Sequence, residues 1–294
     1  MGKVTAIQWC HHTFNPWWGC SRVSPACVRC YADTFAKRAG HGDLWRKHGE
    51  RRFFGEKHWA EPIAWDRDAA AAGERRRVFC ASMSDVFELH PEFEVANRMA
   101  DARHRLWDLI AATTNLNWLL LTKRPENALS LAPFGVFPPN VWIGTSVENQ
   151  EWADRRIPTL VEIPAVVRFL SCEPLLGPVG LGRWLLDGQT GADAHREQAP
   201  VPASRATASV NWVIGGGESG GTVARRLVKH VDGSWVPNDR GLEWARSLRA
   251  QCVAAGVPFL WKQWGGPTSK SGGRELDGRT WDEVPVPTLQ EASV

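Results

Sequence analysis

The chain has 294 residues, 43% of them hydrophobic, and a formal net charge of +3. This length can bury a large core, so we expect one domain over 1–294 rather than two smaller ones. The charge is too small to indicate nucleic-acid binding by itself, the apolar runs are far below the ~18 residues of a membrane span, and the N-terminus lacks a signal-peptide pattern. We therefore expect a cytoplasmic protein with reduced thiols, because seven cysteines without a secretion signal do not suit a disulfide framework.

Short apolar segments rich in β-formers recur along the chain, and most are followed by a helical pattern. The expected strands are 7–9, 77–81, 117–122, 141–146, 166–171, 211–215 and 258–262. The expected helices are 31–38, 93–112, 125–131, 151–157 and 239–255. Near-continuous apolar strands that alternate with helices predict an α/β fold with a parallel sheet covered on both sides. Two insertions, 40–74 and 185–209, and a surface-wrapping tail, 265–294, complete the expected domain.

A compact group of thiols precedes the first expected helix. Cys20, Cys27 and Cys30 form a Cys-x6-Cys-x2-Cys run directly after the segment 15–19, Asn-Pro-Trp-Trp-Gly. A proline within the run keeps the first two thiols on irregular backbone, whereas the third is expected to open a helix whose positive end would stabilise an anionic cluster. A closed structural zinc or iron–sulfur site normally needs four protein ligands, so three thiolates indicate an open site.

A closed zinc site is the alternative interpretation of the same run. Cys-x2-Cys is a common zinc knuckle, and Cys10, His11 or His12 could fold back to supply a fourth ligand. The residues alone leave both alternatives open.

Polar residues gather at the expected carboxyl ends of six strands. They are Ser82, Ser84 and Asp85; Lys123 and Arg124; Ser146, Glu148 and Asn149; Cys172 and Glu173; Gly215 to Glu218; and Lys262 and Gln263. In an α/β barrel this face carries the active site. Strand-end solvation or helix capping explains any one of them, so the prediction of a site depends on their coincidence.

Several motifs together resemble a known family. They are the three-cysteine loop after 15–19, Ser82-x-Ser-Asp-x-Phe87, Leu121-Thr-Lys-Arg-Pro125, Ser146-Val-Glu-Asn149, Ser171-Cys-Glu-Pro174, Gly216-Gly-Glu-Ser-Gly220 and Lys262-Gln-Trp-Gly265. From Ile7 to about Pro285 the chain resembles a phage-associated three-cysteine family that is distantly similar to radical S-adenosylmethionine (SAM) enzymes. The resemblance implies a partial (β/α)6-type, TIM-like barrel with a [4Fe-4S] cluster and SAM. It also implies Cys20, Cys27 and Cys30 as cluster ligands and, for a phage-encoded chain, the host cytoplasm.

The resemblance further implies where SAM binds. By their strand positions, Ser82, Ser84 and Asp85 match the residues for the SAM amino group, and Ser146, Glu148 and Asn149 match those for the ribose hydroxyls. The usual radical SAM loop is Cys-x3-Cys-x2-Cys with an aromatic residue before the last cysteine; here Arg29 takes that place, and Tyr31 is the expected substitute against adenine. Gly216, Gly217 and Glu218 spell a SAM-binding motif but follow the sixth strand, so we expect Glu218 to face substrate or adenine.

Such an enzyme uses one electron, from a donor such as flavodoxin or ferredoxin, to cleave SAM, and the radical formed removes a hydrogen atom from substrate. We expect the catalytic residues to be Lys123, Glu173, Glu218 and Cys172. Cys172 and, as a second choice, Cys80 are the candidate hydrogen donors, with the helical Cys252 as control. The alternative for each thiol is simple packing as a small apolar filler.

Local arginine clusters and 17 tryptophans are compatible with a nucleobase substrate in DNA, for hypermodification or repair, flipped out and stacked on an aromatic ring. Lys123 and Arg124 would then take the phosphate. A free nucleotide or a peptide side chain is the alternative substrate. Two further classes stay open: a zinc- or cluster-stabilised nucleic-acid-binding protein without catalysis, and a redox or iron-sensing protein.

Overall fold

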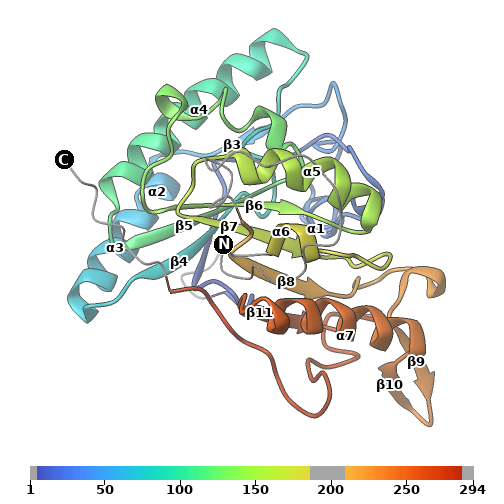
Figure 1. Cartoon of the computed structure of the whole chain (residues 1–294). Coiled ribbons are helices and arrows are strands. Elements are labelled where there is room, and N and C mark those ends of the chain that lie inside the picture. Colours follow the sequence, from blue (N-terminus) through green and yellow to red (C-terminus); the bar gives the residue numbers. More distant parts are fainter. Residues whose placement is uncertain (1–4, 186–208, 287–294) are drawn as a thin grey trace, which may run out of the picture.

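The computed structural model describes residues 5–185 and 209–286, and its centre is a seven-stranded sheet (Figure 1). In spatial order the strands are β1 His12–Phe14, β4 Arg76–Cys80, β5 Leu116–Thr122, β6 Val141–Ser146, β7 Val167–Cys172, β8 Trp212–Gly216 and β11 Phe259–Gln263. Every neighbouring pair is parallel, and β1 and β11 form the two edges. The sheet is curled into an open half-barrel, which confirms the expected α/β fold and its partial TIM-like barrel.

The remaining elements connect these strands. The helices are α1 Tyr31–Arg38, α2 Glu56–Trp59, α3 Glu61–Ala72, α4 Phe93–Ala112, α5 Gln150–Glu162, α6 Gly182–Leu185 and α7 Asp239–Ala254. Short 3-10 turns are η1 Pro25–Cys27, η2 Pro125–Asn127, η3 Pro133–Gly135 and η5 Val223–Arg225. Two small antiparallel pairs are formed by β2 Trp17–Trp18 with β3 Arg52–Phe53, and by β9 Val228–Val231 with β10 Ser234–Pro237.

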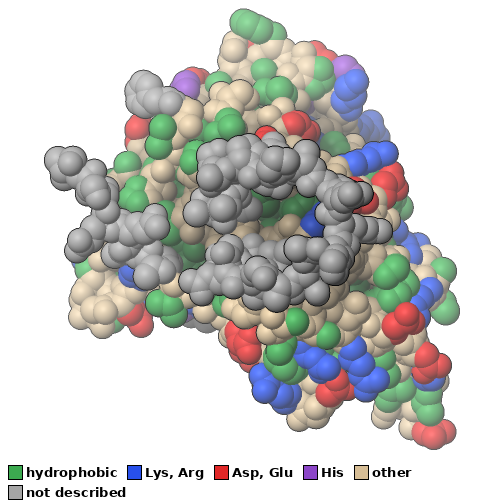
Figure 2. Space-filling view, viewed as in Figure 1, with side chains coloured by type: hydrophobic (Ala, Val, Ile, Leu, Met, Phe, Trp, Pro, Cys, Tyr) green, Lys and Arg blue, Asp and Glu red, His purple; other side chains and the backbone are tan. Residues whose placement is uncertain are grey.

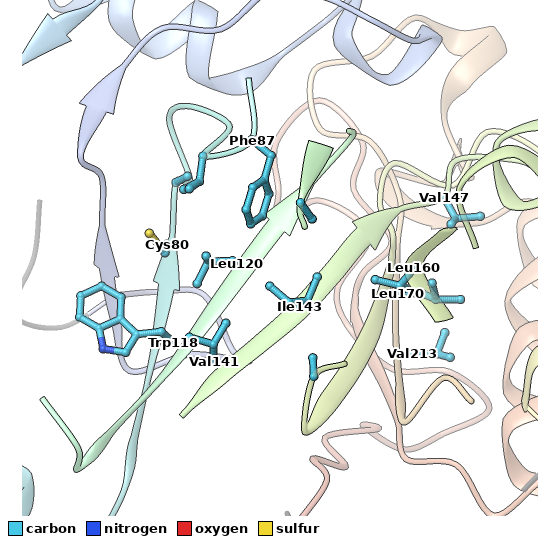
Figure 3. Packing of buried hydrophobic residues seen from close by; sticks show 14 of the residues in the cluster. Cys80, Phe87, Trp118, Leu120, Val141, Ile143, Val147, Leu160, Leu170 and Val213 are labelled. Carbon is cyan, nitrogen blue, oxygen red and sulfur yellow. The ribbon is translucent and has the colours of Figure 1, made fainter. Parts of the chain in front are cut away.

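The larger hydrophobic cluster lies between the sheet and its covering helices. Figure 3 shows part of it, including Cys80, Leu120, Ile143 and Leu170 from four successive strands. The helices meet these residues with apolar stripes, which on α4 comprise Val95, Met99, Ala102, Leu106, Leu109 and Ile110. This three- and four-residue spacing is the periodicity of a helix that buries one face, and it explains why α4 is so readily predicted.

The opposite face of the sheet carries a second, aromatic cluster. Trp9, Phe79, Trp142, Phe169 and Trp212 meet there with ring centroids 4.4 to 6.4 Å apart. Tilted and edge-on ring pairs of this kind each contribute about 0.5–1.5 kcal/mol beyond area burial. The inside of the half-barrel is therefore filled with rings along the amino-terminal and middle positions of the strands, and polar inward positions remain at the carboxyl ends.

Three expected elements differ in the structure. The first strand is β1 rather than 7–9, because the segment around Trp9 packs into the aromatic cluster instead of pairing. The expected helix at 125–131 is only the turn η2, and α5 continues past Pro158 to Glu162. In α5 the buried Ile157 and Leu160 on either side of the proline keep the helix against the sheet, so tertiary packing outweighs the local helix-breaking tendency.

The expected insertions and tail have mixed outcomes. Residues 40–74 contain α2 and α3, and α3 buries Trp65 and Ala69 in the larger cluster, so this helix belongs to the covering layer. Most of 185–209 lies outside the described residues. Described residues of the 265–294 tail run beside β11, where the amide of Trp261 donates to the carbonyl of Trp281 (2.9 Å). Among the described residues, no helix is long and apolar enough to cross a membrane.

Candidate active site at the carboxyl ends of the strands

The three-cysteine loop follows a tight turn at Gly19. Its φ of +111° favours glycine, and an added Cβ would lie 2.6 Å from the carbonyl oxygen of Leu44. The amide of Cys20 donates to that same carbonyl (3.1 Å), which anchors the start of the loop. Cys30 is the N-cap of α1, as expected, and Cys27 ends η1. The expected start of a helix at Cys30 is thus confirmed, whereas Cys27, expected on irregular backbone, lies in a short 3-10 helix that begins at Pro25.

A buried arginine fastens this loop to the ends of β4 and β5. Arg124 Nη1 donates to Asp85 Oδ2 (2.8 Å), and its Nη2 donates to the carbonyl of Ser21 (2.8 Å). The same Nη1 lies 3.6 Å from Cys20 Sγ. Glu88 accepts the amide of Ser21 (2.7 Å) from the other side. These charge-assisted hydrogen bonds place the first thiol directly over the strand ends.

A second arginine fastens the loop to the segment after β8. Arg225 binds both carboxylate oxygens of Glu218, at 2.7 and 2.5 Å, and also donates to the carbonyl of Pro25 (3.2 Å). Arg29, between the second and third thiols, donates to the carbonyl of Gly220 (3.3 Å). Glu218 is therefore engaged in holding the loop, whereas we expected it to face substrate or adenine.

Tyr31 makes a third connection. Its hydroxyl donates to the carbonyl of Ser82, at the end of β4, over 2.5 Å, while the ring is largely exposed. Ser82 Oγ also bonds the side chain of Asn15 (3.1 Å), and Ser84 Oγ has no hydrogen-bond partner among the described residues. The aromatic ring that follows Cys30 thus lies at the strand end where we expected SAM to bind.

The three thiols have different electrostatic surroundings. Burial raises the pKa of Cys20, and the carboxylates of Glu88 and Asp85 oppose ionisation further, against Arg124. Burial also opposes ionisation of Cys27, but Lys123 and nearby hydrogen bonds hold the pKa of that thiol below its ordinary value. Burial and the balance of nearby charges and hydrogen bonds therefore make Cys27 easier to ionise than Cys20.

The loop thiols are donors of the kind that an iron–sulfur cluster takes. In the ranges 5–185 and 209–286, no three His, Cys, Asp or Glu side chains converge as ligands of one metal ion. A [4Fe-4S] cluster binds each cysteine through a different iron, so its thiols need not meet at one point as zinc ligands must. Cys20, Cys27 and Cys30 are free and partly buried, and Arg124 beside Cys20 and Lys123 near Cys27 are cations that suit an anionic cluster.

The expected fourth zinc ligands do not join this loop. Cys10 lies in the aromatic cluster inside the half-barrel, and burial raises the pKa of its thiol to about 12. His11 accepts the backbone amide of Arg77 (2.8 Å), near the amino-terminal end of β4. His12 stacks on Trp65 of α3, with ring centroids 4.5 Å apart. Residues 10–12 are therefore held in place by other contacts, and the alternative in which one of them folds back to complete a zinc site with the cysteines is wrong.

An ion pair lies on the inner side of the strand ends. Glu173, just after β7, accepts from Lys262 Nζ of β11 (3.2 Å). A Cβ at Gly216 would come within 2.4 Å of the Glu173 carboxylate, so glycine is needed there for close approach. Gly217 packs as closely against the carbonyl of Trp264. Both glycines thus allow a neighbouring group to approach the backbone closely, and neither has a positive φ. Glu173 and Lys262 face the concave side.

Three expected SAM contacts have local structural partners instead. Asp85 accepts from Thr122, Lys123, Phe87 and Arg124, and although burial opposes ionisation, Arg124 and these hydrogen bonds lower its pKa. Asn149 caps α5 by accepting the amide of Trp152 (3.2 Å). Glu148 is fully buried and pairs with Arg156 of α5 (3.0 Å). Of the β6 group, Ser146 alone projects to the concave side, by its alternation with Ile143.

Cys172 and Cys80 do not reach the concave side. Both belong to the larger hydrophobic cluster, together with the intended control Cys252 of α7. Burial raises the pKa of the Cys172 thiol well above its ordinary value. Side chains alternate along β7, so Ser171 points to the concave side and Cys172 points under the helices. Register therefore corrects our choice of Cys172 as a hydrogen donor.

Sequence reasoning missed the residues that fasten the loop. Ser21, Glu88 and Arg225 were not among the candidate site residues, although their hydrogen bonds hold the thiol loop. The bond from Arg225 to Pro25 joins positions 200 residues apart, and no periodicity or spacing reports such a pair. One signal in the sequence could have indicated Arg225: the acid of the Gly-Gly-Glu motif, Glu218, needs a nearby cation if it is buried.

The fold and site define a parallel half-barrel with a cysteine loop fixed over the strand ends. A family model described as "Protein of unknown function (DUF5131)" matches residues 4–285, and the chain belongs to this family. No curated protein matches the chain significantly. The family match gives no information on a phage origin.

Solved structures of spore photoproduct lyase variants are similar to the chain. A variant with one cysteine replaced by serine has a TM-score of 0.49 at 12% identity, covering 88% of this chain and 79% of that one. A tyrosine-to-phenylalanine variant has a TM-score of 0.46 at 12% identity, over 83% and 73%. A double variant with bound AdoMet and dinucleoside spore photoproduct has 0.38 at 15% identity, and there the match spans 56% of this chain and under half, 46%, of that chain.

Proposed function

We propose that this protein is a radical SAM enzyme. Cys20, Cys27 and Cys30 would hold a [4Fe-4S] cluster, and SAM would complete the coordination of its fourth iron. When bound, the cluster and SAM supply one-electron cleavage of SAM and a radical that removes a hydrogen atom from substrate, with the electron coming from a donor such as flavodoxin or ferredoxin. The observation that carries the proposal is the thiol loop fastened across the carboxyl ends of a parallel half-barrel by Arg124 and Arg225.

The surrounding side chains have distinct roles in this proposal. Tyr31 and the free hydroxyl of Ser84 flank the end of β4, where SAM would be oriented. The pair of Glu173 and Lys262 would position the substrate on the concave side. The aromatic cluster below excludes water from that side, which a reactive radical requires.

The proposed substrate is a nucleobase in DNA, acted on in hypermodification or repair. A planar base suits a site bordered by an exposed tyrosine ring, and Lys123 stands beside the thiol loop for a phosphate. A thymine nucleotide carries methyl C–H bonds on its base and further C–H bonds on its sugar, and either kind can provide a hydrogen atom for abstraction.

Anaerobic reconstitution with iron and sulfide, followed by addition of SAM and a reductant, tests the proposal. We expect about four irons per chain, a broad visible absorbance and release of 5′-deoxyadenosine. Stoichiometric zinc that survives Cys20→Ala would instead indicate a zinc-stabilised binding protein. A cluster that leaves SAM intact would indicate a redox or sensing protein.

A further inference from the structure

A groove of about 500 Å³ lies beside the cysteine loop, between η2 and α5. Its lining residues are Val23, Leu89, Lys123, Arg124, Glu126, Asn127, Trp152, Arg155, Arg156 and Thr159. Val23 belongs to the loop itself, and Arg124, which also lines the groove, donates to the carbonyl of Ser21 in the loop, so the groove borders the proposed active site. Its volume lies within the ~300–1,000 Å³ typical of ligand sites.

The groove is strongly basic. Four cations and one carboxylate line it, whereas a hollow of about 640 Å³ on α7 is lined by two of each, Asp239 and Glu243 against Arg246 and Arg249. Figure 2 shows the same mixing of basic and acidic side chains on the face that includes α7. Among the described residues, an excess of one charge is thus a property of the groove and not of every hollow.

Three of the four cations are available to a ligand. Arg124 is excluded because Asp85 and the loop already engage its guanidinium. Lys123 makes no ion pair with a described residue, and Arg155 holds only an exposed pair with its helix neighbour Glu151. Arg156 is only 3% exposed; its Nη1 pairs with Glu148 and donates to the carbonyl of Ser146, whereas its Nε and Nη2 have no hydrogen-bond partner in the described chain. An oxyanion that reached this buried guanidinium would satisfy donors that the protein leaves unpaired.

Two of these cations lie against the same aromatic ring. The guanidinium groups of Arg155 and Arg156 lie 5.0 and 4.1 Å from the centroid of the Trp152 ring, which is half-buried. Cations held against an indole keep their side chains ordered, and an indole beside a basic groove is a surface on which a base stacks. Exposed Leu89 and Val23 add apolar contact on the opposite wall.

We infer that this groove binds a single strand of DNA, with phosphates on Lys123, Arg155 and Arg156 and a base against Trp152. Separate cations along a groove match the repeated charges of a phosphodiester chain better than the single carboxylate of SAM. The inference rests on the proposed function for its choice of DNA, and it assigns the strand a path that ends at the thiol loop.

The test is fluorescence anisotropy of a labelled oligothymidylate of about 12 nucleotides with the full-length protein, across a salt series. Arg155→Ala should weaken binding about five- to tenfold and lower the salt slope by about 0.7, the value for one lost single-strand contact. Trp152→Ala should weaken binding about tenfold through lost stacking.

Arg279→Ala is the matched control. Arg279, like Arg155, lies over a tryptophan, is more than half exposed and pairs with a glutamate four residues away, but it lies in the tail beside β11. Its removal should leave binding and the salt slope unchanged. Equal losses in the two arginine variants, or none in either, would overturn the inference, as would an Arg155→Ala effect on SAM binding alone. The assay needs no turnover, so failure of SAM cleavage does not decide it.

Discussion

Two groups of cysteines in this protein show how surroundings change one residue type. Cys20, Cys27 and Cys30 lie partly buried on a loop among charged side chains at the strand ends. Cys80, Cys172 and Cys252 lie fully buried under the helices, in an apolar cluster. Thiolates are the form that binds metal, and in the first group Lys123 and nearby hydrogen bonds hold the pKa of Cys27 below its ordinary value, whereas burial raises the pKa of all three thiols in the second group. The difference teaches that apolar packing under the helices makes a thiol inaccessible, whereas a thiol at the carboxyl ends of the strands remains accessible to a metal or a reagent.

Replacing a loop cysteine should have the largest effect. We expect Cys27→Ala to remove most of the reconstituted iron and to reduce SAM cleavage by more than about 100-fold, because a cluster cannot be held by two thiols. Iron analysis and 5′-deoxyadenosine release measure this. Cys252→Ala is the matched control and should keep its iron. Equal iron in both variants would show that the loop is not the cluster site.

Breaking the buried ion pair between Arg124 and Asp85 should have the second-largest effect, and here the expected loss is in the free energy of unfolding. Arg124→Gln leaves Asp85 buried without its cation, and this typically costs about 3–5 kcal/mol. Urea unfolding followed by circular dichroism measures the loss. Arg105→Gln removes an exposed arginine from its pair with Glu56 and should leave the midpoint unchanged. If both variants unfold at the same urea concentration, the pair does not hold the loop.

The pH dependence of the same pair follows from Asp85. Its pKa is lowered in the folded protein, so the stability it contributes is present above the ordinary carboxyl pKa of about 3.9 and is lost as the pH falls toward the folded value. We therefore expect the difference between the parent and Arg124→Gln to shrink below about pH 4. A difference that grows on acidification would contradict this assignment.

Alkylation rates should separate the thiols before any metal is added. A lowered pKa leaves more thiolate at neutral pH, so Cys27 should react with iodoacetamide at least tenfold faster than Cys252, whose pKa burial raises to about 12. Peptide mass spectrometry of the folded protein identifies the labelled sites. Lys123→Met should shift the Cys27 rate profile to higher pH. Uniform labelling would mean that the loop and the covered cluster do not differ.

The smallest effect should come from Cys172→Ala. A shortened side chain in the covered cluster should cost about 1 kcal/mol of unfolding free energy, as for an ordinary core substitution. SAM cleavage by the reconstituted protein should match the parent, because this thiol faces away from the concave side. Intact cleavage with product diverted to an adduct would restore Cys172 as a hydrogen donor.

Much of the fold was predictable because it depends on local patterns. The apolar run 117–122 and the amphipathic stretch 93–112 correspond within one residue to β5 and α4. The gathering of polar residues at one edge of the sheet was also predictable, since parallel strands bring their carboxyl ends to the same edge. The roles of individual residues were harder to predict. Asn149, for example, was expected to bind SAM, but its side chain caps α5.

By itself, the sequence determined the α/β class, the order of the six sheet strands from β4 to β11, and the helix start at Cys30, because periodicity, proline, glycine and helix caps act over a few residues. The tertiary structure decided which thiols face the concave side and which acids are already paired. Strand register turned Cys172 under the helices, and Arg225 met Glu218 and Pro25 only after folding. Contacts between residues far apart in the chain depend on packing that no local pattern encodes, and in this protein such contacts hold the site together.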